Sequence, residues 1–138
     1  YERSTALGLR GAHLHHRMGQ LLAEVPDGAL TAAEVGDAFL QLHAFRARSC
    51  ATQHRLDRGE RLGAETSVDK VLLATAEQAL FGLAGDGLAD AVLLGDDPEA
   101  EKWRTEVLYS RAATIYGGSA EIQRNIIAKR LLDLGADR

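Results

Sequence analysis

The chain has 138 residues, of which 46% are apolar and 26% charged, a length that suits one globular domain and is short for two. Its formal net charge of −4 disfavours nucleic-acid binding, because no excess of basic side chains attracts the phosphates. The one cysteine, Cys50, excludes an internal disulfide and a cysteine-rich zinc site, and no apolar run is long enough to span a membrane. We therefore expect one cytoplasmic domain without membrane insertion.

Two long helices are expected in the first half of the chain. Over residues 1–25, apolar side chains recur at steps of three, four and seven, and Pro26 and Gly28 end the helix. Thr31 and Glu34 have the spacing of a capping box, which starts a second helix that continues toward about Arg58. The apolar stripes of these helices consist of Leu7, Leu14, Met18, Leu21, Leu22 and Val25, and of Val35, Phe39, Leu42 and Phe45.

A third helix is expected after the polar loop at residues 59–65, with Thr66 and Asp69 as its caps. Three glycines at short intervals, Gly82, Gly85 and Gly87, predict its end. Because no strand precedes them, they favour a helix stop and turn over a phosphate-binding loop. Residues 88–94 are apolar but too few for periodicity to assign.

Two further helices are expected in the last third of the chain. Asp97 as cap and Pro98 as first helical residue start one that stops near residues 116–118. Ser119 caps the other, and Gly135 stops it. The apolar side of this last helix consists of Ile122, Ile126, Ile127, Leu131 and Leu134. Since no stretch alternates like a strand, we predict an all-α fold, an antiparallel four- to five-helix bundle.

Three groups of side chains are interpreted as structural. On a helix His15 lies about 200° around the axis from His13, and no second group of ligands is near His13, His15 and His16 in sequence, which disfavours a metal site. Cys50 is interpreted as a small core residue rather than a nucleophile. The five arginines between residues 46 and 61 are interpreted as a solvated face near a helix C-terminus.

The most informative segment is residues 114–132, with the sequence TIYGGSAEIQRNIIAKRLL. Gly117 and Gly118 allow a close backbone approach to a ligand, and a helix start at Ser119 offers N–H groups to anionic or polar atoms. A generic turn before a core helix has the same sequence features. The residues alone therefore leave a ligand contact and a structural turn both open.

Residues 115–132 closely resemble the end of acyl-CoA dehydrogenases, the flavoenzymes that desaturate acyl-CoA thioesters between Cα and Cβ. More loosely, residues 1–12 resemble the opening of the family's C-terminal helical domain and residues 64–80 resemble its middle helix. The family's N-terminal and middle domains have no counterpart in these residues. Because Tyr1 already stands in a helix-compatible run, we expect the chain to be part of a longer polypeptide.

The resemblance implies a catalytic glutamate that removes the Cα proton while FAD accepts a hydride from Cβ. The common position of this base, directly before the glycine of the turn, is occupied here by Gly117. In another branch of the family the base lies in the first helix of the domain before an arginine, and Glu2 and Arg3 resemble that pair. Glu2 is thus the implied base, with an ordinary first-turn acidic residue as the alternative.

The same resemblance implies the contacts of substrate and cofactor. Arg3 faces the CoA moiety and Gly118 lines the substrate. The implied contacts with FAD are Ser119, Ala120 and Glu121. Gly85 lies in a loop that, in the family, meets the FAD of the neighbouring subunit.

Two parts of the family's inter-subunit flavin site are missing. Where the family has an arginine followed two residues later by Phe-Gly, residues 18–28 contain no such group. A Gln-x-x-Gly-Gly loop corresponds to residues 81–85, where Phe81 replaces the glutamine and Ala84 the first glycine. These departures resemble the subunits of heteromeric acyl-CoA dehydrogenases that form half the usual number of flavin sites.

The resemblance implies the C-terminal domain of an FAD-dependent acyl-CoA dehydrogenase of lipid metabolism, inactive as an isolated chain. It implies an acyl-CoA substrate, a homo- or heterotetramer and an electron-transfer flavoprotein as electron acceptor. One alternative is a non-catalytic helical subunit or interaction domain that stabilises a catalytic partner. Another is an acyl-CoA oxidase, which uses oxygen. The identity of the acyl chain stays open.

Overall fold

The computed structural model describes the backbone of residues 2–135 and the side chains of residues 9–135. Six α-helices, one 3₁₀ helix and no strand occur in this part of the chain, which confirms the predicted all-α fold. The elements are α1 (Glu2–Glu24), α2 (Ala32–Asp57), α3 (Glu65–Gly87), α4 (Ala89–Leu94), α5 (Pro98–Ser110), η1 (Arg111–Thr114) and α6 (Ala120–Arg130).

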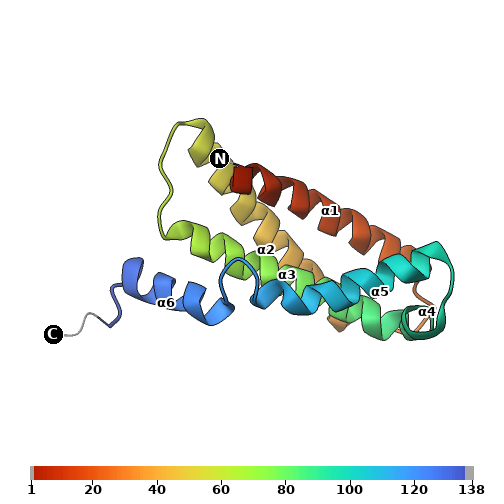
Figure 1. Cartoon of the computed structure of the whole chain (residues 1–138). Helices are drawn as coiled ribbons and strands as arrows, with labels where there is room; N and C mark the ends of the chain where they lie inside the picture. The colour runs from red at the N-terminus through yellow and green to blue at the C-terminus, as the bar shows by residue number, and fades with distance from the viewer. Residues whose placement is uncertain (1, 136–138) are drawn as a thin grey trace.

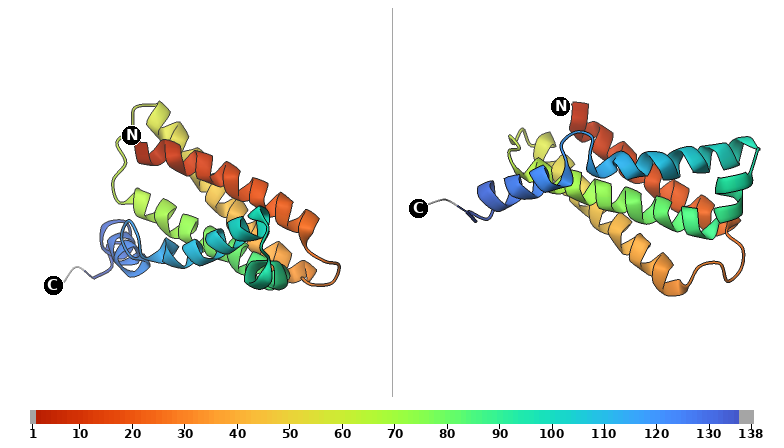
Figure 2. Two further views of the ribbon diagram at one scale, coloured as in Figure 1. Left: turned by 45° about the vertical axis from the view of Figure 1, so that its right-hand side comes forward. Right: turned by 60° about the horizontal axis from the view of Figure 1, so that its bottom comes forward.

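The long helices α1, α2, α3 and α5 form an antiparallel bundle (Figure 1). Helix α3 contacts α1, α2, α5 and α6, and short α4 turns the chain from α3 into α5. Figure 2 shows that α6 lies beside the first half of α3 and extends past the end of the bundle. None of the described helices is long and apolar enough to cross a membrane.

The buried face of α2 follows a seven-residue repeat, the pattern of a helix–helix seam. Its members are Ala38, Leu42, Phe45, Ser49 and Thr52. Phe39, predicted to lie in the core, is 48% exposed because Ala38 takes the inward position. The Phe39 ring instead stacks on His43 and meets the edge of His15. Cys50 also lies off this seam and is exposed, so its interpretation as a core residue is wrong.

The core of the bundle lies between α1, α2, α3 and α5. On α1 the predicted stripe is correct for Leu14, Met18 and Leu21, whereas Leu22 is 47% exposed because it lies one position beyond the seam. The facing core residues include Leu42, Phe45, Ala76, Leu80, Phe81, Ala84 and Trp103. Burial of these apolar side chains is the main force that holds the four helices together.

Three predicted helix starts are confirmed. Thr31 and Glu34 form the capping box, with 2.7 Å between the Thr31 nitrogen and a Glu34 carboxylate oxygen. The Asp97 carboxylate accepts two N–H groups in the first turn of α5, where Pro98 is the first helical residue. The Ser119 hydroxyl accepts an N–H group in the first turn of α6. In each case a local side chain satisfies a backbone donor that the helix leaves open.

The start of α3 differs from the prediction, because neither Thr66 nor Asp69 is its cap. Asp69 is fully buried and accepts hydrogen bonds of 3.0 Å from the Thr52 hydroxyl and from Arg48 Nε, both on α2. Burial raises the pKa of Asp69, while Thr52 and Arg48 oppose the rise. The side chain therefore joins α2 to α3 instead of capping α3.

The arginines near the end of α2 form a solvated face only in part. Besides Arg48, the Arg55 guanidinium binds the carboxylates of Glu60, at 2.7 Å, and Glu65, at 3.1 Å. These pairs hold the loop between α2 and α3 against both helices. Arg46 and Arg61 are exposed, as expected.

The glycines at the end of α3 do not all stop the helix. Gly82 and Gly85 lie inside α3, and only Gly87 ends it, so the predicted stop is wrong at the first two. A Cβ at Gly87 would lie 2.8 Å from Val25 Cγ2 and 2.9 Å from Leu30 Cδ1. A larger residue at this position would therefore force the side chains of Val25 and Leu30 to shift where the linker between α1 and α2 crosses the end of α3.

The last two long helices are shorter than predicted. Helix α5 ends at Ser110 and continues as η1, because Gln78 and Lys70 of α3 donate hydrogen bonds to the carbonyl oxygens of Ser110 and Ala113. Helix α6 ends at Arg130 instead of reaching Gly135.

The apolar side predicted for the last helix is largely exposed. Ile122, Leu131 and Leu134 are 55%, 39% and 59% exposed, whereas Ala120 is buried. The reason is that α6 packs against α3 beyond the end of the bundle, so one side of α6 meets a neighbouring helix and the other faces outward.

Candidate functional site

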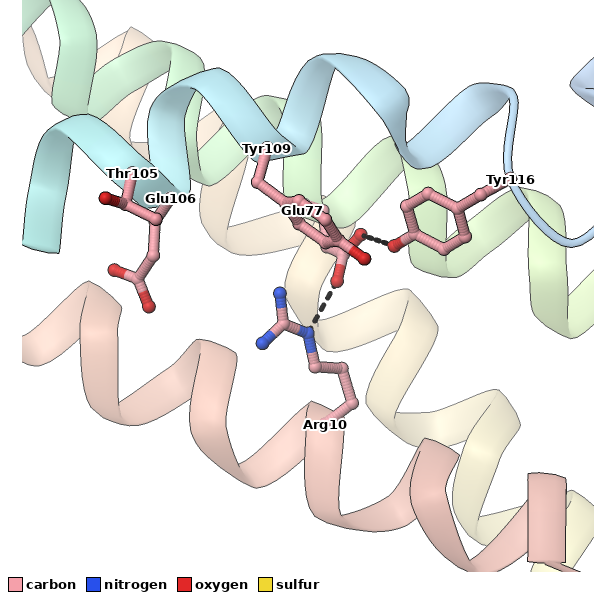
Figure 3. A pocket seen from close by; sticks show the side chains of 6 residues that line it. All are labelled: Arg10, Glu77, Thr105, Glu106, Tyr109 and Tyr116. Atoms are coloured by element: carbon pink, nitrogen blue, oxygen red, sulfur yellow. Dashed lines mark hydrogen bonds and ion pairs between the residues drawn. The ribbon is translucent and has the colours of Figure 1, made fainter.

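A cavity of about 360 Å³ opens between α1, α3 and α5, close to the turn that precedes α6 (Figure 3). It is lined by Arg10, Glu77, Thr105, Glu106, Tyr109 and Tyr116. This volume lies in the range of small-ligand sites, but the lining is more polar and more charged than is usual for them.

Glu77 of α3 is the central polar group of the cavity. Its carboxylate is 2% exposed and accepts hydrogen bonds from Arg10 Nε and, at 3.0 Å, from the Tyr116 hydroxyl. A buried carboxylate needs such partners, because its desolvation is otherwise very unfavourable. The three side chains tie α1, α3 and the segment after η1 to one another.

The guanidinium of Arg10 uses one edge for this contact. Its Nε atom pairs with Glu77, and the terminal nitrogens point away from Glu77 into the space between α1 and α5 (Figure 3). The Arg10 side chain keeps 30% of its surface exposed. The cavity therefore presents cationic N–H donors on the side of Glu106 and Tyr109.

Glu106 forms the far wall and is held by two residues of α1. One oxygen lies 3.1 Å from His13 Nε2, and the other accepts from Arg17 Nε at 2.7 Å. Arg17 is fully buried, with its guanidinium 3.4 Å from the ring centroid of Trp103. Its Nη1 atom also donates to Glu99, at 2.6 Å.

Tyr116 connects the cavity to the glycine turn. Burial first, and then the Glu77 carboxylate, raises the pKa of Tyr116 to about 12, so the phenol stays protonated. Tyr109 stacks on its ring with 5.5 Å between centroids, and Lys70 Nζ lies 4.0 Å from the ring centroid. Lys70 also donates to the Ala113 carbonyl at 2.9 Å, which fixes the preceding 3₁₀ turn.

The turn after Tyr116 requires glycine. Gly117 and Gly118 have φ angles of 68° and 103°, which strain any residue with a Cβ, and a Cβ at Gly118 would clash with the Gln123 amide. Bare backbone is thus presented beside the N-terminus of α6.

The turn presents groups that suit one part of FAD, the cofactor implied by the sequence resemblance, and not another. Exposed backbone and the Ser119 hydroxyl fit the polar edge of a flavin ring. Glu121 does not fit a phosphate, because its pKa is lowered by its own backbone N–H group and by Ser119, which keeps it anionic. The residues present therefore fit the ring of the cofactor and not its diphosphate.

The structure brings together some of the predicted site residues. Gly118, Ser119, Ala120 and Glu121 are contiguous at the turn and the start of α6. Gly85 lies near the other end of α3, where a Cβ would be 3.5 Å from Val107 of α5. Gly85 is therefore not part of the same site within one chain.

Glu2 and Arg3 belong to the first turn of α1. Their side chains lie outside the described residues, so the structure assigns them no contacts.

The sequence interpretation missed the cavity residues Arg10, Glu77 and Tyr109. One signal was present: Arg10 and Arg17 are seven residues apart, and Arg17 interrupts the apolar stripe between Leu14 and Leu21. A charged residue in such a position is a candidate for a buried ion pair. No local pattern, however, identified the partner carboxylates.

The histidines of α1 have separate contacts. Besides the His13 contact with Glu106, His15 Nδ1 lies 3.0 Å from the Gly11 carbonyl, and His16 is exposed. Among the described residues, no group of three or more histidine, cysteine or acidic side chains has the arrangement of a metal site.

The fold and this site define an all-α bundle domain that carries a ligand-sized polar cavity beside a glycine turn. The chain matches the C-terminal domain of acyl-CoA dehydrogenases over residues 7–132, and it belongs to this family.

Two relatives carry the name acyl-CoA dehydrogenase IpdE1. The protein from Mycolicibacterium smegmatis is 34% identical over 128 residues, which cover 91% of this chain and 31% of that protein. The protein from Mycobacterium tuberculosis is 44% identical over 70 residues, which cover 51% of this chain and 18% of that protein. The chain thus spans less than a third of the length of these relatives. No solved structure matches it significantly.

Proposed function

We propose that this domain is the C-terminal part of an FAD-dependent acyl-CoA dehydrogenase that desaturates an acyl-CoA thioester between Cα and Cβ in cytoplasmic lipid metabolism. The observation that carries the proposal is family membership over residues 7–132. A cavity of about 360 Å³ beside the glycine turn offers space for part of a ligand. The names of the relatives support the same class of reaction.

In this proposal Glu2 is the base that removes the Cα proton. It stands at the start of α1, and Arg10, which lines the cavity, follows on the same helix about 12 Å further along the axis. A carboxylate becomes a better base when surrounding groups exclude water from it. In this proposal the bound acyl chain and the rest of the enzyme exclude water from the Glu2 carboxylate.

The neighbouring residues bind and orient the reactants. Arg3 contacts the CoA moiety, where an arginine can pair with phosphate oxygens. Gly118 lines the substrate with backbone alone. FAD supplies the hydride acceptor when it is bound, and its ring edge is held by Ser119, Ala120 and Glu121.

Replacement of the base tests this assignment. In the complete protein, Glu2→Gln should lower turnover by about 100- to 10,000-fold, the usual contribution of a general base. Flavin content should not change, because the amide preserves the shape of the side chain. Turnover is measured as acyl-CoA-dependent bleaching of the flavin and reduction of an electron acceptor.

The matched control is Glu101→Gln, which makes the same change on the exposed side of α5. It should leave turnover unaltered. Unchanged turnover in Glu2→Gln would exclude Glu2 as the base and favour a non-catalytic role. The isolated 138-residue chain should desaturate no acyl-CoA, because thioester and flavin must be positioned by further domains.

We also propose a heteromeric assembly in which this subunit completes half of the usual flavin sites. Phe81 and Ala84, which stand in place of the family's Gln and Gly, are 1% and 0% exposed inside α3, where they offer no polar contact. Electrons then pass to an electron-transfer flavoprotein. Purification of a tetramer of one subunit type with one FAD per chain would refute this assembly.

A second candidate is a non-catalytic helical subunit that stabilises a catalytic partner. It is favoured by the exposed apolar side chains near the end of the chain, because Ile122 of α6 is 55% exposed and Leu134, which follows α6, is 59% exposed. The Glu2→Gln experiment separates the two candidates, since only the first makes turnover depend on this side chain.

A further inference from the structure

We propose that Lys70 supplies a positive charge behind the glycine turn and makes a flavin ring held at this turn easier to reduce. The inference rests on the proposed function, because it takes FAD to bind beside Gly118 and Ser119. Lys70 lies on α3, 43 residues before Ala113 in the chain, so it is not part of the motif that carries the turn. It touches neither reactant in this scheme and is a positioning residue that acts through the turn.

Three contacts place the Lys70 side chain against the turn. Its Nζ atom donates to the Ala113 carbonyl at 2.9 Å and lies 4.0 Å from the ring centroid of Tyr116. A Cβ built at Gly117 would lie 3.7 Å from Lys70 Cε, which is ordinary van der Waals contact. Lys70 and Gly118 also border the same narrow gap beside the start of α6. The side chain therefore reaches from the end of η1 to the turn.

The charge of Lys70 is incompletely compensated. Among the side chains that the structure describes, no carboxylate forms an ion pair with Lys70. Burial lowers the pKa of Lys70, and the attraction of Glu77, which is itself paired with Arg10, opposes this only in part. A half-buried cation in this state is stabilised by any negative charge that appears beside it, and it stabilises that charge in return.

The redox step creates negative charge on the side of the turn where Lys70 can act. In the proposed reaction the substrate loses a proton from Cα to the base and a hydride from Cβ to the flavin. A hydride carries two electrons and one proton, so the neutral oxidised ring gains one negative charge. A cation fixed behind the ring stabilises this product and not the neutral ring, which shifts the reduction equilibrium toward the reduced form.

A purely structural role of Lys70 predicts a different result, and Gln78 separates the two. Gln78 Nε2, also on α3, donates to the Ser110 carbonyl at 3.3 Å and to the Thr114 hydroxyl at 3.4 Å. It therefore holds the same segment without a charge. If only the hold on this segment matters, loss of Gln78 and loss of Lys70 change the flavin alike. If the charge matters, only the loss of Lys70 does.

The test measures the two-electron reduction potential of the flavin in the complete protein with its natural subunits. Lys70→Gln keeps a hydrogen-bond donor but removes the charge. It should lower the equilibrium constant for reduction about 4- to 15-fold, which is about 18–35 mV, the effect of one unit charge about 10 Å away at an effective dielectric constant of about 20–40. Lys70→Arg keeps the charge and should stay within about twofold of the unmodified protein.

Two controls isolate the charge from the fold. Gln78→Leu should leave the equilibrium constant within about twofold, because it removes a hold on the segment but no charge. Lys102→Gln, the same loss of charge at an exposed site on α5, should leave it unaltered. Glu121, whose lowered pKa keeps it anionic at the turn, is the same in every variant and cancels from the comparison.

A second measurement uses the intact lysine. The lysines of this chain are reductively methylated with isotope-labelled methyl groups, and the Lys70 signal is identified by its absence in Lys70→Arg. Because coupling between two sites is reciprocal, reduction of the flavin should raise the pKa of Lys70. An unchanged pKa would contradict the inference even if Lys70→Gln did not fold.

An equal fall in potential in Gln78→Leu and Lys70→Gln would overturn the inference, because both residues would then act by holding the segment. An unaltered potential in Lys70→Gln would overturn it as well. The proposed function is tested separately, since flavin bleaching by an acyl-CoA supports that function whatever the value of the potential.

Discussion

Arg10 and Arg17 stand seven residues apart on α1 and pair with carboxylates of other helices, yet their surroundings differ. Arg17 is fully buried, stacked on Trp103 and bonded to three side chains, Glu106, Glu99 and Gln20. Arg10 binds Glu77 through Nε, and its side chain is 30% exposed beside the cavity. The same residue type in the same register therefore has a structural task at one position and remains available to a ligand at the other.

The difference follows from the helix that covers each residue. Around Arg17, α5 approaches closely enough for Trp103 to lie over the guanidinium. Around Arg10, the chain leaves α5 through η1, and the two tyrosines Tyr109 and Tyr116 border open space instead of closing it. The ion pair of Arg17 is thus covered by α5, whereas the ion pair of Arg10 borders a ligand-sized cavity because α5 ends nearby.

The largest expected effect comes from Arg17→Met. Removing this cation leaves Glu106, which is 16% exposed, with His13 as its remaining partner, whereas Glu99 is 41% exposed and can be hydrated. The expected cost is therefore about 3 kcal/mol, the lower end of the range for breaking a buried ion pair. Urea unfolding of the purified chain should show this loss in the free energy of unfolding.

Arg46→Met is the control for that measurement. The change is the same, but Arg46 is exposed, so the free energy of unfolding should stay within about 0.5 kcal/mol of the unmodified value. If Arg17→Met and Arg46→Met both lower the free energy of unfolding by less than about 0.5 kcal/mol, burial does not explain the difference between Arg10 and Arg17.

A smaller loss of stability is expected for Lys70→Met, which tests whether Lys70 stabilises the segment that carries Tyr116 beside the cavity. The variant loses the 2.9 Å hydrogen bond to Ala113 and the contact 4.0 Å above the Tyr116 ring, about 1–2 kcal/mol in total. Hydrogen exchange should rise over residues 111–118 and stay unchanged in α2. A rise spread evenly over the bundle would show that Lys70 stabilises the whole domain rather than the turn.

The smallest effect concerns Tyr116 in alkaline solution. Its pKa is about 12 in the folded chain against an ordinary value of 10.0, so its contribution to stability is complete below pH 10.0 and is lost as the pH rises toward about 12. A pKa difference of about two corresponds to about 2.7 kcal/mol of stability, which partial exposure and solvent screening reduce to about 1 kcal/mol.

The measurement is a phenolate absorbance titration of the protein and of Tyr116→Phe. The difference between the two curves should show the ionisation of one phenol, Tyr116, well above the ordinary tyrosine pKa of 10.0. A difference centred at the ordinary tyrosine pKa would show that the phenol is neither buried nor close to Glu77.

Local features of the fold could be predicted from sequence because their partners are neighbours in the chain. The Thr31 and Glu34 capping box, the Asp97 cap and the Ser119 cap each act across two or three residues. The same reasoning failed at Asp69, which has the residue type of a cap but is buried against α2. There a tertiary hydrogen bond outweighed local preference.

The cavity could not be predicted because its contacts join distant parts of the chain. Arg10 and Glu77 are 67 residues apart, and His13 and Glu106 are 93 residues apart. Helical periodicity places each of them on a face but does not select the partner. Glu2 and Gly118 came from resemblance to a family, and their roles remain predictions.

The position of Trp103 has a spectroscopic consequence. It is the one tryptophan of the chain, it is 1% exposed, and its indole N–H donates to Glu24 at 2.8 Å. Its fluorescence therefore reports whether α1 and α5 are in contact, since separation of these helices would expose the indole to water and shift its emission to longer wavelength.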